Sequence, residues 1–262
     1  MGMTNFSKLT GGLALLSLTL AACNPMPAGP SYPAKAATVT TVTGSVSSWS
    51  RGAATARLTD DTGATTLASG SVNAAGQLTL TLPSGATVAP YLSAYTSADL
   101  SDGSGCTGSV TASDQQAGIF EMTSLDAVQN SVKVSELDPT TYSVVDNSDT
   151  RFEISINGRA WYYADRPVKL SGNVNCAVTG GALSAKLDVN LSPGWNAVGV
   201  TGSYVVTRDA ESFSLNIHNE NDGQSAWMED TNFSMMSQGA STRTRAAELY
   251  ALALDRVENV GR

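Results

Sequence analysis

The sequence predicts an all-β protein made of two antiparallel β-sandwich modules with a short C-terminal α-helix. Three observations support this prediction. Apolar and hydroxyl side chains alternate from Thr38 onward, as they do in half-buried antiparallel strands. Turns rich in glycine, asparagine and aspartate separate the alternating runs at short intervals. After Ser241 the composition changes to residues that favour helix.

Residues 1–22 have the features of a secretory signal peptide. Lys8 supplies a positive charge, and residues 9–20 form a short apolar stretch that contains Gly11 and Gly12. This stretch is too short for a stable membrane-spanning helix. We therefore expect the chain to be exported.

The signal peptide ends in Leu20-Ala21-Ala22-Cys23, which resembles the lipobox of bacterial lipoproteins. The resemblance implies that Cys23 is lipidated and becomes the N-terminus. Acyl chains gain about 0.8 kcal/mol per buried methylene, so several of them hold a protein firmly on a membrane. Asn24 rather than aspartate follows the cysteine, which implies the outer membrane rather than the inner one where an organism has both. The alternative is a plain signal peptide in which Cys23 is incidental.

Residues 23–37 are predicted to form a proline-rich tether behind the lipid. Pro25, Pro27, Pro30 and Pro33 exclude a regular helix or strand ladder over this stretch. A polyproline-like spacer extends by about 3 Å per residue. We expect it to hold the folded part away from the membrane.

The first β-sandwich module is predicted over residues 38–150. Its clearest strands are 38–47, 53–59 and 77–82. The sequences Gly44-Ser45-Val46 and Gly76-Gln77-Leu78-Thr79-Leu80-Thr81-Leu82-Pro83 make residues 38–83 resemble transthyretin-like, or carboxypeptidase regulatory-like, modules of bacterial surface proteins. That resemblance implies a β-sandwich.

The second β-sandwich module is predicted over residues 151–240. Its strands are expected at 151–156, 160–163, 168–178, 183–191, 197–206, 212–218 and 225–233. Asn157-Gly158 and Asp222-Gly223 favour tight hairpins because these residues tolerate positive φ. Residues 241–262 form the predicted C-terminal helix, whose Leu249, Leu252 and Val257 lie near one face.

Charge and histidine content exclude several classes of function. The chain has 15 Lys and Arg against 23 Asp and Glu, a formal net charge of -8. It therefore lacks the basic surface that nucleic-acid binding requires. The single histidine, His218, excludes metal sites with several histidine ligands. The sequence has no nucleophile-elbow or phosphate-binding-loop motif, and no Gly-x-Gly-x-x-Gly turn that follows a predicted strand and opens a helix. We expect no enzyme and no cofactor; a hydrolase would depend on His218 alone.

Two further features leave alternatives open. Cys106 and Cys176 are either a disulfide, as exported proteins favour, or two buried free thiols. Trp161-Tyr162-Tyr163 places neighbouring rings on opposite faces of a strand, so Trp161, Tyr163 and Trp195 form either an exposed platform for a glycan or partner, or plugs between two sheets.

Residues 218–223 with Glu229 imitate the ligand spacing of an EF-hand calcium loop. The first ligand position would be His218 rather than a carboxylate, and the flanking segments have the pattern of strands rather than helices. We predict a polar turn here and no metal site.

Taken together, these features predict a lipid-anchored cell-envelope protein with a non-catalytic structural or protein-binding role. Its expected partners are the membrane, through the lipid, and another envelope protein or a glycan. The alternative is a carbohydrate- or small-ligand-binding accessory lipoprotein, which an exposed patch of Trp161, Tyr163 and Trp195 would favour. A hydrolase that uses His218 is the third.

Overall fold

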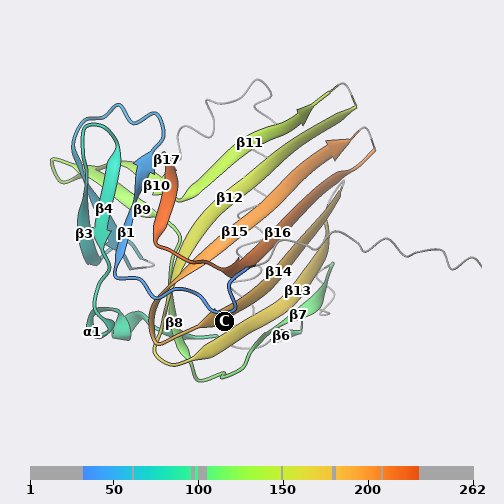
Figure 1. The fold of residues 1–262 in the computed structure, drawn as a ribbon, viewed down its shortest axis with the longest axis horizontal. Helices are drawn as coiled ribbons and strands as arrows, with labels where there is room; N and C mark the ends of the chain where they lie inside the picture. Colours follow the sequence, from blue (N-terminus) through green and yellow to red (C-terminus); the bar gives the residue numbers. More distant parts are fainter. Residues whose placement is uncertain are drawn as a thin grey trace, which may run out of the picture. The chain divides into compact units, whose positions relative to one another are not determined.

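The computed structural model describes residues 32–60, 62–95, 98–99, 105–148, 150–178, 181–207 and 209–229. These residues form an all-β fold, as the alternation predicts, with a closed seven-stranded barrel and a curled ten-stranded sheet (Figure 1). Helical structure in this part of the chain is one short stretch, α1 (Gly85–Val88) followed by the 3-10 turn η1 (Ala89–Tyr91). The predicted signal peptide, Cys23 and the predicted C-terminal helix lie outside the described residues.

The barrel is one sheet closed on itself. Its strands follow the order β1-β17-β10-β9-β2-β3-β4, and β1 also pairs with β4. The bounds are β1 (Thr41–Val46), β2 (Ala54–Thr59), β3 (Thr66–Val72), β4 (Gln77–Thr81), β9 (Leu125–Gln129), β10 (Val132–Asp138) and β17 (Gln224–Glu229). A closed sheet fills its interior with its own apolar side chains, so the prediction that a second sheet would cover these strands in a sandwich is wrong.

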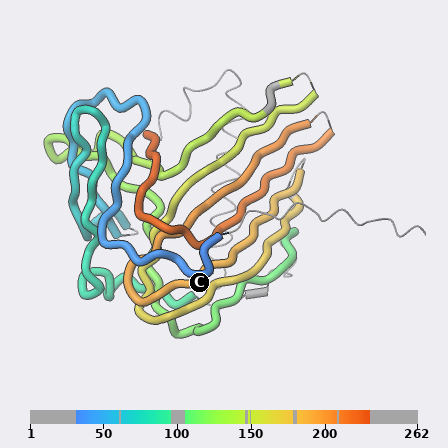
Figure 2. The backbone as a smooth tube through the Cα atoms, viewed as in Figure 1, coloured from blue at the N-terminus to red at the C-terminus, as the bar shows by residue number. Residues whose placement is uncertain are grey.

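The second sheet is open and curled. Its bounds are β5 (Ser93–Ala94), β6 (Ala98–Asp99), β7 (Cys106–Ala112), β8 (Gly118–Met122), β11 (Thr140–Asn147), β12 (Arg151–Ala164), β13 (Val168–Val178), β14 (Gly181–Leu191), β15 (Gly194–Thr207) and β16 (Glu211–Asn219). The strand order is β5-β8-β12-β15-β16-β14-β13-β7-β6, with β11 beside β12. Without the two-residue strands β5 and β6, the eight others form a half-barrel (Figure 2).

The half-barrel has an apolar face and a polar face. Along β14, for example, Leu183 and Leu187 are buried while Lys186 and Asp188 are exposed. We call the side that carries Leu183 and Leu187 the apolar face, and the other side the polar face. Near the barrel the polar face also carries large rings, and there it packs against the barrel: Trp161 and Trp195 belong to one core cluster with barrel residues such as Leu80.

The chain passes between the two sheets several times. It builds β1 to β4 in the barrel, β5 to β8 in the half-barrel, β9 and β10 in the barrel, β11 to β16 in the half-barrel, and β17 in the barrel. The sheets are therefore not two successive segments. The boundary expected near residue 150 lies between β11 and β12, which pair with each other.

Residues 32–40 form a strap that docks on the half-barrel. The Ala36 amide donates to the Asn190 carbonyl (3.1 Å) and the Ala37 amide to the Glu220 carbonyl (2.8 Å). Further on, the Ala197 amide donates to the Ala37 carbonyl (2.9 Å). The last residues of the expected free tether, 32–37, are thus part of the folded body.

Candidate functional site

The strap covers the single histidine. The ring of Tyr32 stacks on the ring of His218, with centroids 3.6 Å apart and an interplanar angle of 29°. Beside this pair, the Asn219 side-chain amide donates to the Pro33 carbonyl (2.8 Å), and the Asn190 side-chain amide donates to the Ala34 carbonyl (3.0 Å). These contacts fix the backbone of the strap where it crosses the ends of β14 and β16.

Burial favours the neutral form of His218. Its Nδ1 lies 3.2 Å from the Asn216 carbonyl, which can only accept, so Nδ1 carries the proton. Burial lowers the pKa of His218; the Asn216 carbonyl and Glu220 oppose this shift, and Arg159 adds to it. The Nε2 atom faces the Glu220 carboxylate at 3.9 Å, which is too long for a hydrogen bond.

An ion pair lies beside this histidine on the polar face. Arg159 of β12 lies 3.1 Å from the Glu220 carboxylate, and both side chains are about four-fifths buried. Arg159 also donates to the Gly158 carbonyl (3.2 Å), whereas its buried Nε–H has no hydrogen-bond partner among the described residues. A buried donor without a partner costs about 1–3 kcal/mol, so this Nε–H is an unfavourable feature of the fold.

A polar groove of about 500 Å³ begins at Arg159. The barrel and the half-barrel both line it: Gly44, Ser45, Gln224, Ser225 and Ala226 come from β1 and β17, Thr141, Asn157 and Arg159 from β11 and β12, and Asp222 from the connection before β17. Hydroxyl, amide and carboxylate groups surround one guanidinium. This set suits a neutral or weakly acidic ligand rich in hydroxyl groups.

The geometry around His218 does not assemble a nucleophile. A hydrolase of the serine type needs a hydroxyl within hydrogen-bond reach of the imidazole and a carboxylate that orients the ring. In the described part of the chain, the hydrogen bond recorded for His218 goes to a backbone carbonyl. The ring face is taken by Tyr32.

The three rings predicted as an alternative platform lie between the sheets. Trp161 is 0% exposed and Trp195 is 5% exposed. Trp195 donates through Nε1 to the Pro83 carbonyl (2.8 Å), and its ring meets the ring of Tyr163 edge-on at 5.7 Å. Trp161 and Trp195 are therefore buried between the half-barrel and the barrel, as the second of the two alternatives predicts, and the partly buried Tyr163 packs against the same cluster.

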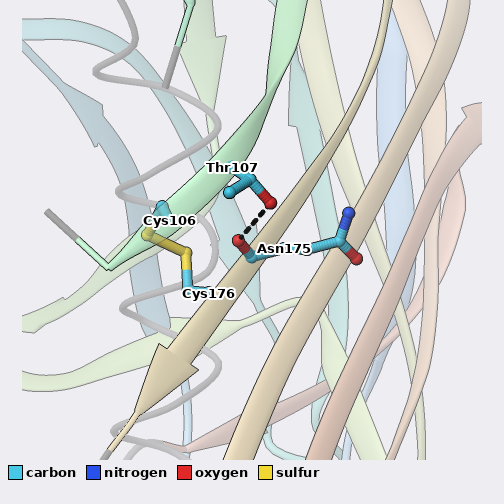
Figure 3. Close-up of a disulfide and its surroundings, with 4 residues drawn as sticks. All are labelled: Cys106, Thr107, Asn175 and Cys176. Carbon is cyan, nitrogen blue, oxygen red and sulfur yellow. Dashed lines mark hydrogen bonds between the residues drawn. A yellow bond between two sulfur atoms is a disulfide. The ribbon is translucent and has the colours of Figure 1, made fainter. Parts of the chain in front are cut away.

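Cys106 and Cys176 are joined by a disulfide (Figure 3). The two cysteines lie directly opposite each other on β7 and β13, although 70 residues separate them in sequence. Next to them, the Thr107 hydroxyl donates to the Asn175 carbonyl (3.4 Å). Of the two alternatives that the sequence left open, the structure has the disulfide, which ties strand β7 to the long strands of the half-barrel.

The described residues contain no cluster of three or more histidine, cysteine, aspartate or glutamate side chains that would suit a metal ion. Glu229, the distant member of the calcium-like spacing, instead pairs with Arg51 at 2.9 Å. Within the same residues, no helix has the length and apolar character needed to cross a membrane.

The comparisons with family models, with curated proteins and with solved structures gave no significant match. The resemblances to bacterial lipoproteins and to transthyretin-like modules rest on the sequence motifs alone.

Sequence reasoning missed Arg159, Asn190 and Asn219. Arg159 follows the predicted Asn157-Gly158 turn and had the character of an ordinary solvated residue. The two asparagines end strands whose partners lie far away in sequence, since the strap precedes them by more than 150 residues. No local pattern carries that information.

Proposed function

We propose that the protein is a lipid-anchored component of the cell envelope with a non-catalytic, structural or protein-binding role. The sequence Leu20-Ala21-Ala22-Cys23 is the observation that supports this proposal. The docked strap adds a limit on distance: Tyr32 is held in the folded body, and nine residue steps connect it to Cys23. Even a fully extended chain of that length reaches only about 30 Å.

This short connection limits how far the folded body can lie from the membrane. The end of the half-barrel around Tyr32 and His218 would stay near the membrane surface, while the rest of the folded body extends away from it. The Cys106–Cys176 disulfide is compatible with export, because such bonds persist in oxidising compartments. A protein held in this way can meet another envelope component without catalysing a reaction.

The anchor is tested by expressing the full chain in a bacterial host and fractionating the cells. We expect the parent protein in the membrane fraction and a peptide beginning at acylated Cys23 in its mass spectrum. Cys23→Ser should be soluble or remain as an unprocessed precursor. Cys106→Ser, which removes a different cysteine, is the matched control and should stay with the membrane. An unmodified Cys23 thiol in the parent would refute the proposal.

A second candidate function is the binding of a glycan or small polar ligand in the groove beside Arg159. The polar lining of the groove, in which the Arg159 side chain lies among hydroxyl, amide and carboxylate groups, favours it. Calorimetric titration with soluble envelope oligosaccharides should show binding that Asn157→Ala and Gln224→Ala each weaken about tenfold, the effect of losing one or two hydrogen bonds. Ser69→Ala, on the exposed surface of β3, should leave it unchanged. No heat of binding would rule this candidate out.

A hydrolase that uses His218 is the third candidate. It predicts turnover of ester or glycoside substrates that His218→Gln abolishes. We expect no such turnover, because the imidazole is packed under Tyr32 and has no hydroxyl among its recorded hydrogen-bond partners in the described chain.

A further inference from the structure

The apolar face of the half-barrel is continuous across neighbouring strands. In register, Ile154 of β12 lies opposite Tyr204 of β15, Tyr204 opposite Phe213 of β16, and Phe213 opposite Leu183 of β14. Leu183 in turn lies opposite Cys176. Further rows follow two residues along each strand, so that one face of the sheet is apolar over most of its area.

This face is buried almost completely. Ile154, Tyr204, Phe213 and Leu183 are each only 1% exposed. An open sheet buries a face only when a further layer packs on it. The apolar face therefore has a cover.

The barrel and the helical turn, which are described in the structure, pack on the polar face of the half-barrel and not on the apolar face. The barrel packs against the opposite face, through Trp161 and Trp195. The helical turn at Gly85 also contacts that side, since a Cβ on Gly85 would meet the Tyr163 hydroxyl. Among the described residues, no helix is left that could cover the apolar face.

The 33 residues after Glu229 contain a segment suited to this place. Leu249–Leu254 reads Leu-Tyr-Ala-Leu-Ala-Leu, six apolar residues in succession, between Arg245 and Glu248 on one side and Asp255 and Arg256 on the other. A helix packs the stripe formed by its apolar residues against the rest of the protein and leaves its charged residues on the outside. As a helix, residues 242–258 would measure about 25 Å, comparable to the width of six paired strands at about 4.8 Å each.

The connection is long enough. Residues 230–241 link Glu229 to this segment and span up to about 40 Å when extended. We propose that residues 242–258 pack on the apolar face of the half-barrel, so that the chain covers its own largest hydrophobic surface. The occupant is this segment rather than a second copy of the chain or an acyl chain.

The test uses residues 24–262 with a photo-crosslinking phenylalanine analogue at position 252. After irradiation, peptide mapping by mass spectrometry should find intramolecular links to the apolar face, for example to Val200, Leu187 or Leu215. The same analogue at position 237, in the connection that precedes the segment, should give at least about fivefold fewer of these links. Links only to the polar face, to the barrel or to another molecule would overturn the proposal.

A second measurement compares two variants of equal charge. Leu249→Asp/Leu252→Asp places two carboxylates in the apolar run, whereas Ser237→Asp/Ser241→Asp places them in the connection before the segment. We expect the first variant to bind several-fold more of the hydrophobic dye ANS than the parent, and the second to match the parent. Equal dye binding by all three would refute the assignment, as would a dimer or a co-purified lipid that accounts for the cover.

A variant that fails to fold does not stop the test. Hydrogen exchange on the parent chain then decides: slow exchange of the 246–254 amides is expected of a docked segment, and exchange at the rate of an unstructured peptide would overturn the proposal.

Discussion

Trp161 of β12 and Trp227 of β17 stack face to face, with ring centroids 5.4 Å apart and planes within 4° of parallel. Both side chains are fully buried. Because β12 belongs to the half-barrel and β17 to the barrel, this pair is a direct packing contact between the two sheets. Neither indole N–H has a hydrogen-bond partner among the described residues, so the pair contributes through packing alone.

Truncating either ring should destabilise the whole fold. We expect Trp161→Ala and Trp227→Ala each to lower the free energy of unfolding by about 3–5 kcal/mol. Trp227→Phe should cost less, since it keeps a ring and removes an unpartnered N–H. A double-mutant cycle measured by urea unfolding should give a coupling of about 1 kcal/mol between the two rings. Strictly additive losses would show that the stack itself contributes nothing.

The disulfide should be a second large contribution to stability. In the chain-entropy model, a bond that closes a loop of this length contributes about 4 kcal/mol. Cys106→Ala/Cys176→Ala, in a chain that begins at Asn24, should therefore unfold at a lower urea concentration than the parent. Dithiothreitol should shift the parent to the midpoint of the variant and leave the variant unmoved. A parent that is insensitive to reductant would mean that the bond is absent in solution.

The alternation of side chains predicts the strands well where partners are close in sequence. Asp60–Gly63 and Asn73–Gly76 connect β2 to β3 and β3 to β4, as expected of turns. Asn157-Gly158 was expected to turn and does not, because β12 runs through it as one strand. At this point β12 is paired with a strand on each side: Gly158 lies opposite Val200 of β15 and opposite Thr140 of β11. Pairing on both edges overrides the local preference of the dipeptide.

The closure of the barrel could not be predicted from local pattern. It depends on the parallel pairing of β1 with β17, in which Val46 lies opposite Trp227. The alternation of side chains within each strand does not reveal a partner so far away in sequence. The candidate site was predictable only in part for the same reason. His218 stands out as the single histidine, but Tyr32, which stacks on it, and Arg159, which pairs with the neighbouring Glu220, come from distant segments.

The stack of Tyr32 on His218 predicts a measurable role for the strap. Tyr32→Ala should lower the free energy of unfolding by about 1 kcal/mol and expose the imidazole. Because burial is the main cause of the lowered pKa of His218, the variant's pKa should move up towards the ordinary value. Tyr32→Phe keeps the stacked ring and should behave as the parent. Limited proteolysis should also cut the Ala variant faster within residues 32–40; equal rates would show that the strap does not depend on this contact.

The lowered pKa of His218 makes stability fall in mild acid. Below about pH 6.5 the unfolded chain protonates its histidine, whereas the folded protein resists until the pH reaches its lower pKa. The unfolded state therefore binds more protons, and the free energy of unfolding decreases as the pH falls through this range. His218→Gln has no such proton to bind, so its urea midpoint should change less between pH 7 and pH 5 than that of the parent. Since the chain has one histidine, its Hε1 resonance in the proton NMR spectrum needs no assignment among histidines and reports this pKa directly. A value at or above 6.5 would contradict the burial of the ring beneath Tyr32.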